Sequence, residues 1–315
     1  MKIVVAQPLG LPAEEVKEAL ACFAEEGHTV HVAERIGTQE ETACICADAD
    51  IVILANMPFP DAVINQCPKL RMIDVAFTGV DHIGMEVCRH RDIVVCNASG
   101  YAVRAVSEQA VGMLLSVLRQ IPAMDARVRA CRDREGFAGG EIAGKNCGII
   151  GLGEIGLATA RLLSAFGARV VATSLTQTSG ERAGIPMMPL AEVLRLSDVV
   201  FLHCPLHAST KELIARDTLS MMKEGAILLN MARGGVVNSA DVAEALRTGH
   251  LGFYATDVFD REPPLQAADV LLSAPHTLFL PHTGYATQEA MRMRLSMVKE
   301  NLSAYLAGNP VRVVR

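Results

Sequence analysis

The fold of this chain is decided by residues 146–156, NCGIIGLGEIG. Apolar residues lead into Gly151, and beyond Gly156 apolar residues recur at helical spacing, which predicts a buried strand, a tight turn and an amphipathic helix. Gly151 permits the turn, Gly153 lets the backbone approach a pyrophosphate, and Gly156 lets the helix pack closely on the strand. The free amides at the helix N-terminus favour phosphate binding. The glycines alone also fit an ordinary turn, but beside this strand and helix they predict a dinucleotide site.

The composition narrows the class of protein. The chain has 315 residues, which is too long for one ordinary core and predicts two domains. Half of the residues are hydrophobic, which supplies enough apolar material for buried parallel strands. The net charge of −6 and the lack of a basic run argue against a nucleic-acid partner. The chain begins as a strand rather than as a signal peptide, and no apolar run is long enough to cross a membrane.

The nine cysteines are scattered along the chain and form no CxxC pair. Cys44 and Cys46 lack a second His or Cys pair at the spacing of a zinc site, so we expect no metal. The pattern is typical of free, mostly buried thiols in a reducing compartment, and we expect a cytoplasmic protein.

Short apolar strands alternate with helices in both halves, which predicts parallel, doubly wound α/β sheets. A long helix over 104–121 has one apolar face, and its Glu108 and Gln109 fit a solvated or capping edge. The charged, Gly-rich residues 125–145 predict a surface connection. The other elements expected are strands at 3–6, 29–33, 51–54, 70–76, 93–96, 168–174, 197–203, 225–230, 251–258 and 277–281, and helices at 13–26, 239–248 and 287–307.

Polar clusters follow three predicted strands of the second half, in segments 230–235, 257–264 and 281–285. The carboxyl ends of parallel strands form the edge where a dinucleotide lies, so Arg233, Glu262 and His282 are expected to meet there. An arginine can clamp a carboxylate and polarise a carbonyl, a histidine can transfer a proton near neutral pH, and a carboxylate raises the pKa of that histidine. Each residue alone also fits a surface charge or a structural histidine.

The order of these motifs resembles that of the D-isomer-specific 2-hydroxyacid dehydrogenases. The resemblance covers most of the chain, from about residue 70 to residue 309, and its blocks are specific in combination. They are GVDHI at 79–83, VSEQ at 106–109, GKNCGIIGLGEIG at 144–156, HCPL at 203–206, NMARG at 230–234, DVFDREP at 257–263 and PH at 281–282. The resemblance implies a Rossmann-type cofactor domain at 99–285 and a flavodoxin-like substrate domain formed by 1–98 and 286–315.

The same resemblance implies a role for each site residue. Arg233, Glu262 and His282 would be catalytic, and Asp257 would orient the nicotinamide amide. The substrate carboxylate would bind Arg233 and the backbone of three residues after a strand, Phe77, Thr78 and Gly79, although that segment also fits an ordinary turn. The residues expected to line the cofactor are Gly151, Gly153, Glu154, Ile155, Gly156, Ser174, His203, Cys204, Pro205, Asn230, Met231, Ala232, Asp257, His282 and Gly284.

Three positions depart from the family pattern. Ser174 stands where NAD users of the family have an aspartate that binds the adenosine ribose and repels a 2′-phosphate, so both NAD(H) and NADP(H) stay open. Phe77 takes a place often held by glycine, and it either narrows the substrate pocket or gives it an apolar wall. Gln109 replaces a common histidine, and the tryptophan usual near 132–135 is absent; we expect these changes to concern packing or a dimer contact.

The sequence therefore predicts an oxidoreductase that transfers a hydride between NAD(P)H and a small-molecule 2-oxo acid, which gives a D-2-hydroxy acid. His282 would act as acid and base with support from Glu262, and Arg233 would hold the substrate. Two alternatives stay open, namely a phosphonate- or formate-type dehydrogenase of the same fold and a non-catalytic dinucleotide-sensing protein. The family pattern also implies a homodimer, with the helix at 104–121 as a candidate contact.

Overall fold

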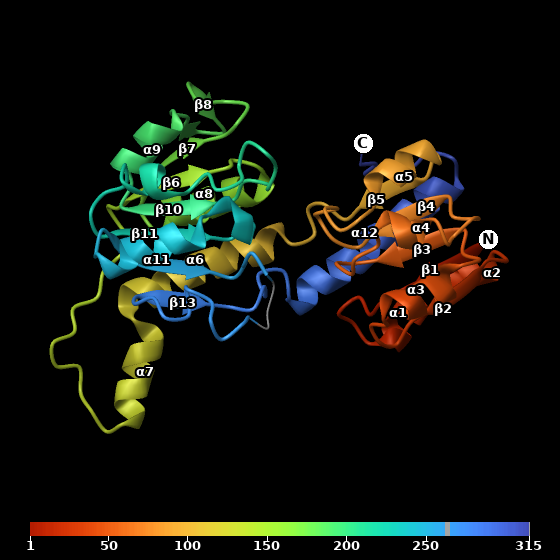
Figure 1. Cartoon of the computed structure of the whole chain (residues 1–315), viewed down its shortest axis with the longest axis horizontal. Helices are drawn as coiled ribbons and strands as arrows, with labels where there is room; N and C mark the ends of the chain where they lie inside the picture. Colours follow the sequence, from red (N-terminus) through yellow and green to blue (C-terminus); the bar gives the residue numbers. More distant parts are fainter. Residues whose placement is uncertain (262–264, 315) are drawn as a thin grey trace. The chain divides into compact units, whose positions relative to one another are not determined.

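The computed structural model describes residues 1–261 and 265–314, and the chain divides into two compact units. The first unit contains Met1–Ala102 and Ala286–Arg315, and the second contains Val103–Tyr285. Each unit is built around its own parallel sheet (Figure 1). The polypeptide therefore leaves the first unit, completes the second, and returns to finish the first.

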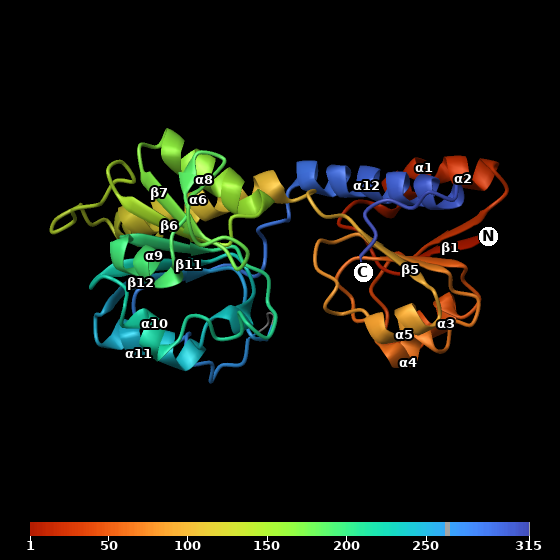
Figure 2. The ribbon, with the colours of Figure 1, turned by 90° about the horizontal axis from the view of Figure 1, so that it is seen from above.

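The sheet of the first unit contains β1 (Lys2–Val5), β2 (Thr29–Val32), β3 (Ile51–Leu54), β4 (Met72–Val75) and β5 (Val94–Asn97). All its pairings are parallel, in the order β2-β1-β3-β4-β5, which confirms the predicted flavodoxin-like sheet. β3 and β4 are buried along their whole length because helices cover both faces. One face carries α1 (Ala13–Ala19), α2 (Ala21–Glu25) and α12 (Gln288–Leu306), and the other carries α3 (Gln39–Cys46), α4 (Asp61–Ile64) and α5 (Met85–His90) (Figure 2).

The main sheet of the second unit contains β6 (Asn146–Ile150), β7 (Arg169–Thr173), β10 (Val199–Leu202), β11 (Ala226–Asn230), β12 (Leu251–Thr256) and β13 (Thr277–Phe279). They run parallel in the order β13-β12-β11-β10-β6-β7. The strand order therefore changes direction at β6, because β7 is added on one side of it and β10 to β13 follow on the other. Such a switch point leaves a crevice at the carboxyl ends of the strands. A small antiparallel hairpin, β8 (Glu181–Arg182) and β9 (Ile185–Pro186), follows β7. The doubly wound arrangement is the predicted one.

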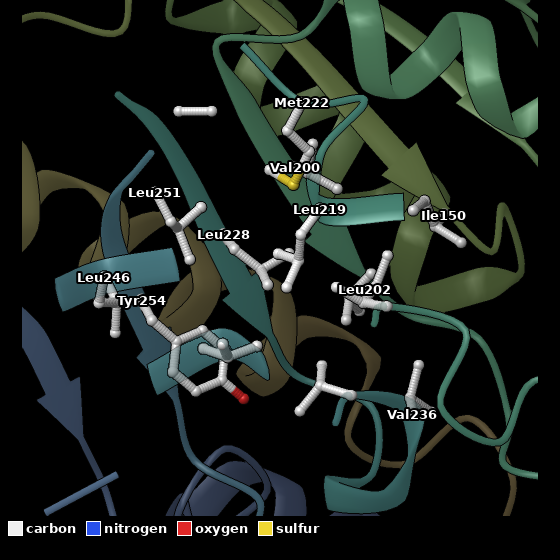
Figure 3. Close-up of a cluster of buried hydrophobic side chains, with 14 of the residues drawn as sticks. Ile150, Val200, Leu202, Leu219, Met222, Leu228, Val236, Leu246, Leu251 and Tyr254 are labelled. Carbon is white, nitrogen blue, oxygen red and sulfur yellow. The ribbon is translucent and has the colours of Figure 1, made fainter. Parts of the chain in front are cut away.

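Helices cover both faces of this sheet. One apolar cluster joins the sheet to α6 (Val103–Arg119) and α8 (Glu154–Ala165). The other joins it to α10 (Arg216–Leu219) and α11 (Ser239–Arg247), and it includes Leu228 of β11 and the fully buried Tyr254 of β12 (Figure 3). A further helix, α9 (Leu190–Leu196), contributes the buried Val193 and Leu194. The strands that carry the polar clusters at their ends are therefore held by an apolar cluster on each face of the sheet.

Two predicted segments differ from the structure. The helix expected over 13–26 is divided into α1 and α2, because Leu20 leaves helical geometry at φ −96° and ψ 1° while its side chain becomes fully buried. The connection expected over 125–145 begins as a helix, α7 (Ile121–Arg129), which starts after Gln120 in the left-handed region at φ 47°. Every residue of α7 is half-buried or exposed, and the helix extends away from its own unit (Figure 1).

All nine cysteines are free, and six of them are buried, which confirms the predicted pattern of thiols. Burial raises the pKa of Cys147 and of Cys96 to about 12, so neither is a reactive thiolate at neutral pH. Among the described residues, no helix combines the length and the apolar character that crossing a bilayer requires.

Asp74 of β4 is a carboxylic acid with no exposed surface, and it gives the first unit a pH-dependent stability. Burial raises its pKa to about 7, against the smaller lowering effects of the Asn301 hydrogen bond and of Arg312. Because the pKa is higher in the folded than in the unfolded chain, the folded chain binds this proton more tightly between about pH 4 and 7. The contribution of Asp74 to the free energy of unfolding therefore falls as the pH rises through that window.

We predict that Asp74→Asn gains stability relative to the wild type as the pH rises from 4 to 8, by about 1.4 kcal/mol for each pKa unit of the shift. Urea unfolding of both proteins at several pH values measures the difference. Asp92→Asn, which replaces an exposed carboxylate, is the control and should show a flat difference. A difference for Asp74→Asn that does not change with pH would contradict this account of Asp74.

Candidate functional site

The glycine turn has the geometry that a dinucleotide requires. Gly151 follows β6 with φ +99°, and a Cβ there would lie 2.6 Å from the Cys204 backbone nitrogen. A Cβ at Gly156 would lie 2.1 Å from the carbonyl oxygen of Gly151, so only glycine lets α8 approach the turn this closely. Gly153 is the N-cap of α8 and differs from both, because a Cβ there would meet no described atom within 4 Å. Its backbone therefore faces open space at a helix N-terminus, where a phosphate is stabilised.

His203, directly after β10, supports the same assignment. Its backbone packs against Gly151, with the His203 carbonyl carbon 2.7 Å from the position of an added Cβ. Neither ring nitrogen has a hydrogen-bond partner among the described residues, although both are buried. Burial lowers the pKa of His203 to about 4, so the ring is neutral at physiological pH. A buried ring that lacks partners is suited to a ligand with polar groups, and it fits a dinucleotide at this turn.

Arg233 is placed by a loop that its own neighbours shape. Asn230, the last residue of β11, accepts a hydrogen bond from the Ala232 amide at 3.0 Å and donates one to the Arg233 carbonyl at 2.9 Å. The Arg233 guanidinium also donates to the Ala232 carbonyl at 2.8 Å. A short 3-10 helix, η1 (Gly234–Val236), begins immediately afterwards. The predicted cofactor residues 230–232 therefore form a rigid support for the arginine.

Asp257, directly after β12, anchors the segment that contains His282. Its carboxylate accepts hydrogen bonds from the Gly284 amide at 2.8 Å and from the Gln109 side chain at 2.9 Å. His282 follows β13 in the left-handed region at φ 52°, which is uncommon for a residue other than glycine and is often found at functional sites. The ring of His282 packs edge-on against Tyr285 with 5.5 Å between centroids. The segment that follows His282 is thus held by Asp257, and the His282 ring is packed against Tyr285.

Two glycines bring the Arg233 and His282 loops to the same short segment, residues 257–260. A Cβ at Gly234 would lie 2.0 Å from the carbonyl carbon of Phe259, and a Cβ at Gly284 would lie 2.7 Å from the carboxylate of Asp257. Backbone approaches this close are available only to glycine. The loops after β11 and β13 therefore pack on the loop after β12, which places the arginine and histidine at the same edge of the sheet.

Several other predicted residues lie next to those already described, and one cannot be placed. Glu154 and Ile155 form the first turn of α8, and Cys204 and Pro205 follow His203. Glu262 lies outside the described residues. Among the residues that the structure does describe, no group of three or more His, Cys, Asp or Glu side chains is arranged to hold a metal.

Ser174 directly follows β7 and begins a tight turn that its side chain stabilises. The hydroxyl accepts a hydrogen bond from the Gln177 amide at 3.1 Å and lies 3.3 Å from the Thr176 hydroxyl. No carboxylate occupies the tip of this turn, SLTQ at 174–177, and the first cation that follows it in the sequence is the exposed Arg182 of β8. The turn therefore lacks the acidic group that discriminates against a 2′-phosphate.

The predicted substrate loop lies in the first unit, directly after β4. The Phe77 amide donates to the Val75 carbonyl at 2.7 Å, and its side chain is buried 6.2 Å from the ring of Tyr101. Thr78 is exposed and Gly79 is half-buried, and their amides donate to no acceptor among the described residues. Two neighbouring amides thus remain available for an anion.

Gln109 is the residue whose role the sequence did not indicate. We expected it at a solvated or capping edge of its helix, or in packing or a dimer contact. Instead its amide donates to Asp257, and its oxygen accepts from the Thr283 hydroxyl at 3.3 Å. It therefore connects α6 to the loops after β12 and β13. Glu108, one residue earlier, is exposed as expected. Only the VSEQ motif itself could have drawn attention to this position.

We predict that Gly153→Ala folds normally but binds NADH at least about tenfold more weakly, because the added methyl enters the space assigned to a phosphate. The backbone of Gly153, at φ −78°, accepts alanine without strain. The change in NADH fluorescence on titration with the protein gives the affinity, and thermal melting confirms the fold. The control is Gly112→Ala, at another position where a Cβ meets no described atom within 4 Å. Equal NADH affinity in wild type and Gly153→Ala would place the phosphates elsewhere.

Comparison with known proteins agrees with this geometry. Residues 111–284 match the model of the D-isomer specific 2-hydroxyacid dehydrogenase NAD binding domain. The D-3-phosphoglycerate dehydrogenase of Methanocaldococcus jannaschii is 32% identical over 98% of this chain, which spans 58% of that longer protein. The glycerate dehydrogenase of Methylorubrum extorquens is 32% identical, over 88% of this chain and 89% of its own length.

Among solved structures, an acyclic imino acid reductase in complex with NADPH and D-Arg has the same fold, with a TM-score of 0.91 over 100% of both chains and 24% identity. The match of the family model covers more than half of this chain, and the glycerate dehydrogenase corresponds to it over almost its whole length. The chain therefore belongs to the D-isomer specific 2-hydroxyacid dehydrogenase family, which consists of nicotinamide-dependent oxidoreductases of 2-hydroxy acids.

Proposed function

We propose that this protein interconverts a 2-oxo acid and the D-2-hydroxy acid, with NAD(H) or NADP(H) as the hydride carrier. The observation that carries the proposal is the packing of the Arg233 and His282 loops on the segment 257–260, at the same edge of the sheet as the glycine turn. A guanidinium and an imidazole at one edge of a dinucleotide-binding sheet are the groups that reduction of a 2-oxo acid needs.

Each residue has one role in the proposed reaction. Arg233 binds the substrate carboxylate and polarises the neighbouring carbonyl, because a guanidinium offers parallel donors to both oxygens. His282 donates a proton to the carbonyl oxygen as the hydroxyl forms, and it takes the proton back in the oxidation direction. Glu262 is assigned to stabilise the imidazolium, although it lies outside the described residues. When bound, the dinucleotide supplies or accepts the hydride.

The proposal assigns a different ligand to each unit. The second unit binds the dinucleotide through Gly151, Gly153 and His203, and its Asp257 orients the nicotinamide amide. The first unit binds the substrate carboxylate at the amides of Thr78 and Gly79. Support for the second assignment comes from the exposure of Thr78 and from the two amides that donate to no described acceptor. The Phe77 amide is not assigned to the carboxylate, because it already donates to the Val75 carbonyl.

The turn at Ser174 bears on the choice between NAD(H) and NADP(H). A carboxylate at this point would accept hydrogen bonds from both adenosine ribose hydroxyls and repel a 2′-phosphate. The Ser174 hydroxyl is instead occupied within the turn, so both effects are lost. We therefore propose that the protein accepts both NADH and NADPH.

Our central functional prediction is that the purified protein oxidises NADH and NADPH in the presence of glyoxylate, hydroxypyruvate or pyruvate. His282→Ala should lower kcat by about 10²–10⁴, the usual range for loss of a general acid, while NADH affinity stays near that of the wild type. Absorbance at 340 nm follows the reaction, and His90→Ala in the first unit, which removes an exposed histidine, serves as the control.

The competing functions give different results in the same assay. Oxidation of formate or phosphonate without reduction of any 2-oxo acid would identify a different dehydrogenase of this fold. Binding of NADH without turnover of any substrate would indicate a sensor. Wild-type turnover in His282→Ala would remove the proposed acid.

We also propose that the protein is a homodimer in which α7 contacts the second copy. The sequence suggested the helix at 104–121 as a candidate contact, and the apolar face of the corresponding α6 packs within the core of its own unit. Ile121 and Val128 of α7 are instead 51% and 72% exposed. Apolar side chains at these exposures on a projecting helix are typical of a protein-protein contact.

We expect light scattering to give the mass of a dimer for the wild type and of a monomer for Ile121→Glu/Val128→Glu, because two carboxylates would have to be buried in the contact. Leu196→Glu in α9, at a site that is 45% exposed, is the control and should stay dimeric. A monomeric wild type, or a dimer that survives both α7 substitutions, would rule out this contact.

A further inference from the structure

A chain of hydrogen bonds in the first unit connects the C-terminal segment to the loop at Thr78. It starts at Arg312, passes through Asn301 of α12, and ends at Asn97 of β5. We propose that Asn97 is a positioning residue for substrate binding and that Asn301 and Arg312 act through it. The inference rests on the proposed function, in which the amides of Thr78 and Gly79 receive the substrate carboxylate.

The two peptide groups that contain these amides are held through their carbonyls. The Asn97 side chain donates to the Thr78 carbonyl at 2.8 Å, and the Ala98 amide donates to the Phe77 carbonyl at 3.1 Å. In a planar trans peptide, the carbonyl and the N–H of the next residue point in opposite directions. Holding the Phe77 and Thr78 carbonyls therefore fixes the directions of the Thr78 and Gly79 N–H groups, which are the donors to the carboxylate.

The Asn97 side chain can hold the loop because its own orientation is determined. Its oxygen accepts from the Ser99 amide at 3.3 Å, which leaves the NH₂ group directed at Thr78. Its backbone amide donates to the Arg312 carbonyl at 3.1 Å, and its backbone carbonyl accepts from the Asn301 side chain at 3.0 Å. Asn97 is thus attached on one side to the loop and on the other to α12 and the C-terminal segment.

Asn301 is fully buried and has only one arrangement that satisfies its neighbours. The Arg312 guanidinium contains only donors, so the Asn301 oxygen must face it, and they are 2.9 Å apart. The Asn301 NH₂ group then donates to both the Asn97 carbonyl and the Asp74 carboxyl, the latter at 2.8 Å. Arg312 is itself paired with Glu300. A surface ion pair therefore determines the orientation of a buried amide, which in turn supports the loop.

The test compares steady-state kinetics of Asn97→Asp, Arg312→Gln and the wild type. Asn97→Asp keeps the shape of the side chain but places a carboxylate oxygen against the Thr78 carbonyl. We expect the KM for the 2-oxo acid to rise by about tenfold or more, the effect of one lost hydrogen bond. The rise should exceed any fall in kcat, since the carboxylate is bound in both the ground state and the transition state. The KM for the dinucleotide should not change.

Arg312→Gln extends the test to a residue that does not touch the loop. It should raise the KM for the 2-oxo acid by a smaller factor than Asn97→Asp and again leave the KM for the dinucleotide unchanged. Asn65→Asp, at an exposed site of the same unit, controls for the added charge. A KM for the 2-oxo acid that stays within about twofold of the wild type in Asn97→Asp would overturn the proposal.

Hydrogen exchange separates a failure of this inference from a failure of the proposed function. Amide exchange in the peptide that covers residues 76–82, measured by mass spectrometry on the whole protein, should be faster in Asn97→Asp and Arg312→Gln than in wild type and Asn65→Asp. If the wild type reduces no 2-oxo acid, the proposed function fails, and faster exchange still supports the positioning of the loop. Unchanged exchange in both variants would overturn it, whatever the activity.

Discussion

The site of this protein depends on how closely backbone segments approach one another at the carboxyl edge of the second sheet. Gly234 lies against Phe259 and Asp260, Gly284 lies against Asp257, and Gly151 lies against Cys204. A side chain at Gly151 or Gly234 would push two backbone segments apart, and one at Gly284 would displace the Asp257 carboxylate. The catalytic proposal therefore rests on close backbone approaches at glycines together with the hydrogen bond between Asp257 and Gly284. The polar residues are positioned by glycines that let their loops meet.

Electrostatics at this edge follow from burial. Asp257 is 2% exposed, and its charge is stabilised by a backbone amide and by the neutral side chain of Gln109. His203 is kept neutral because burial lowers its pKa to about 4. In the proposed function, His203 and Asp257 support the cofactor, whereas Arg233 and His282 carry out the chemistry.

The strands could be predicted because their signal is local. β3 is the uninterrupted apolar run IVIL, and its observed bounds, Ile51–Leu54, are the predicted ones. The site edge was also predictable, since the polar residues that follow parallel strands must share it. The break at Leu20 and the helix α7 were not, because packing decides the first and a left-handed residue at Gln120 begins the second. The role of Gln109 was hidden because its partner Asp257 lies 148 residues away along the chain. The hydrogen bonds from Asn301 to Asp74 and Asn97 join residues that are even farther apart, 227 and 204 positions along the chain, and no local pattern indicates them.

The central claim is that Arg233 and His282 act on one substrate beside the dinucleotide. A crystal structure of the protein with NAD⁺ and oxamate, an analogue of a 2-oxo acid, tests this claim most directly. The account predicts an imidazole nitrogen of His282 within about 2.7–3.2 Å of the oxygen that replaces the 2-oxo group, and Arg233 on the carboxylate of the same molecule. Oxamate bound away from either side chain, or NAD⁺ bound away from Gly153, would contradict it.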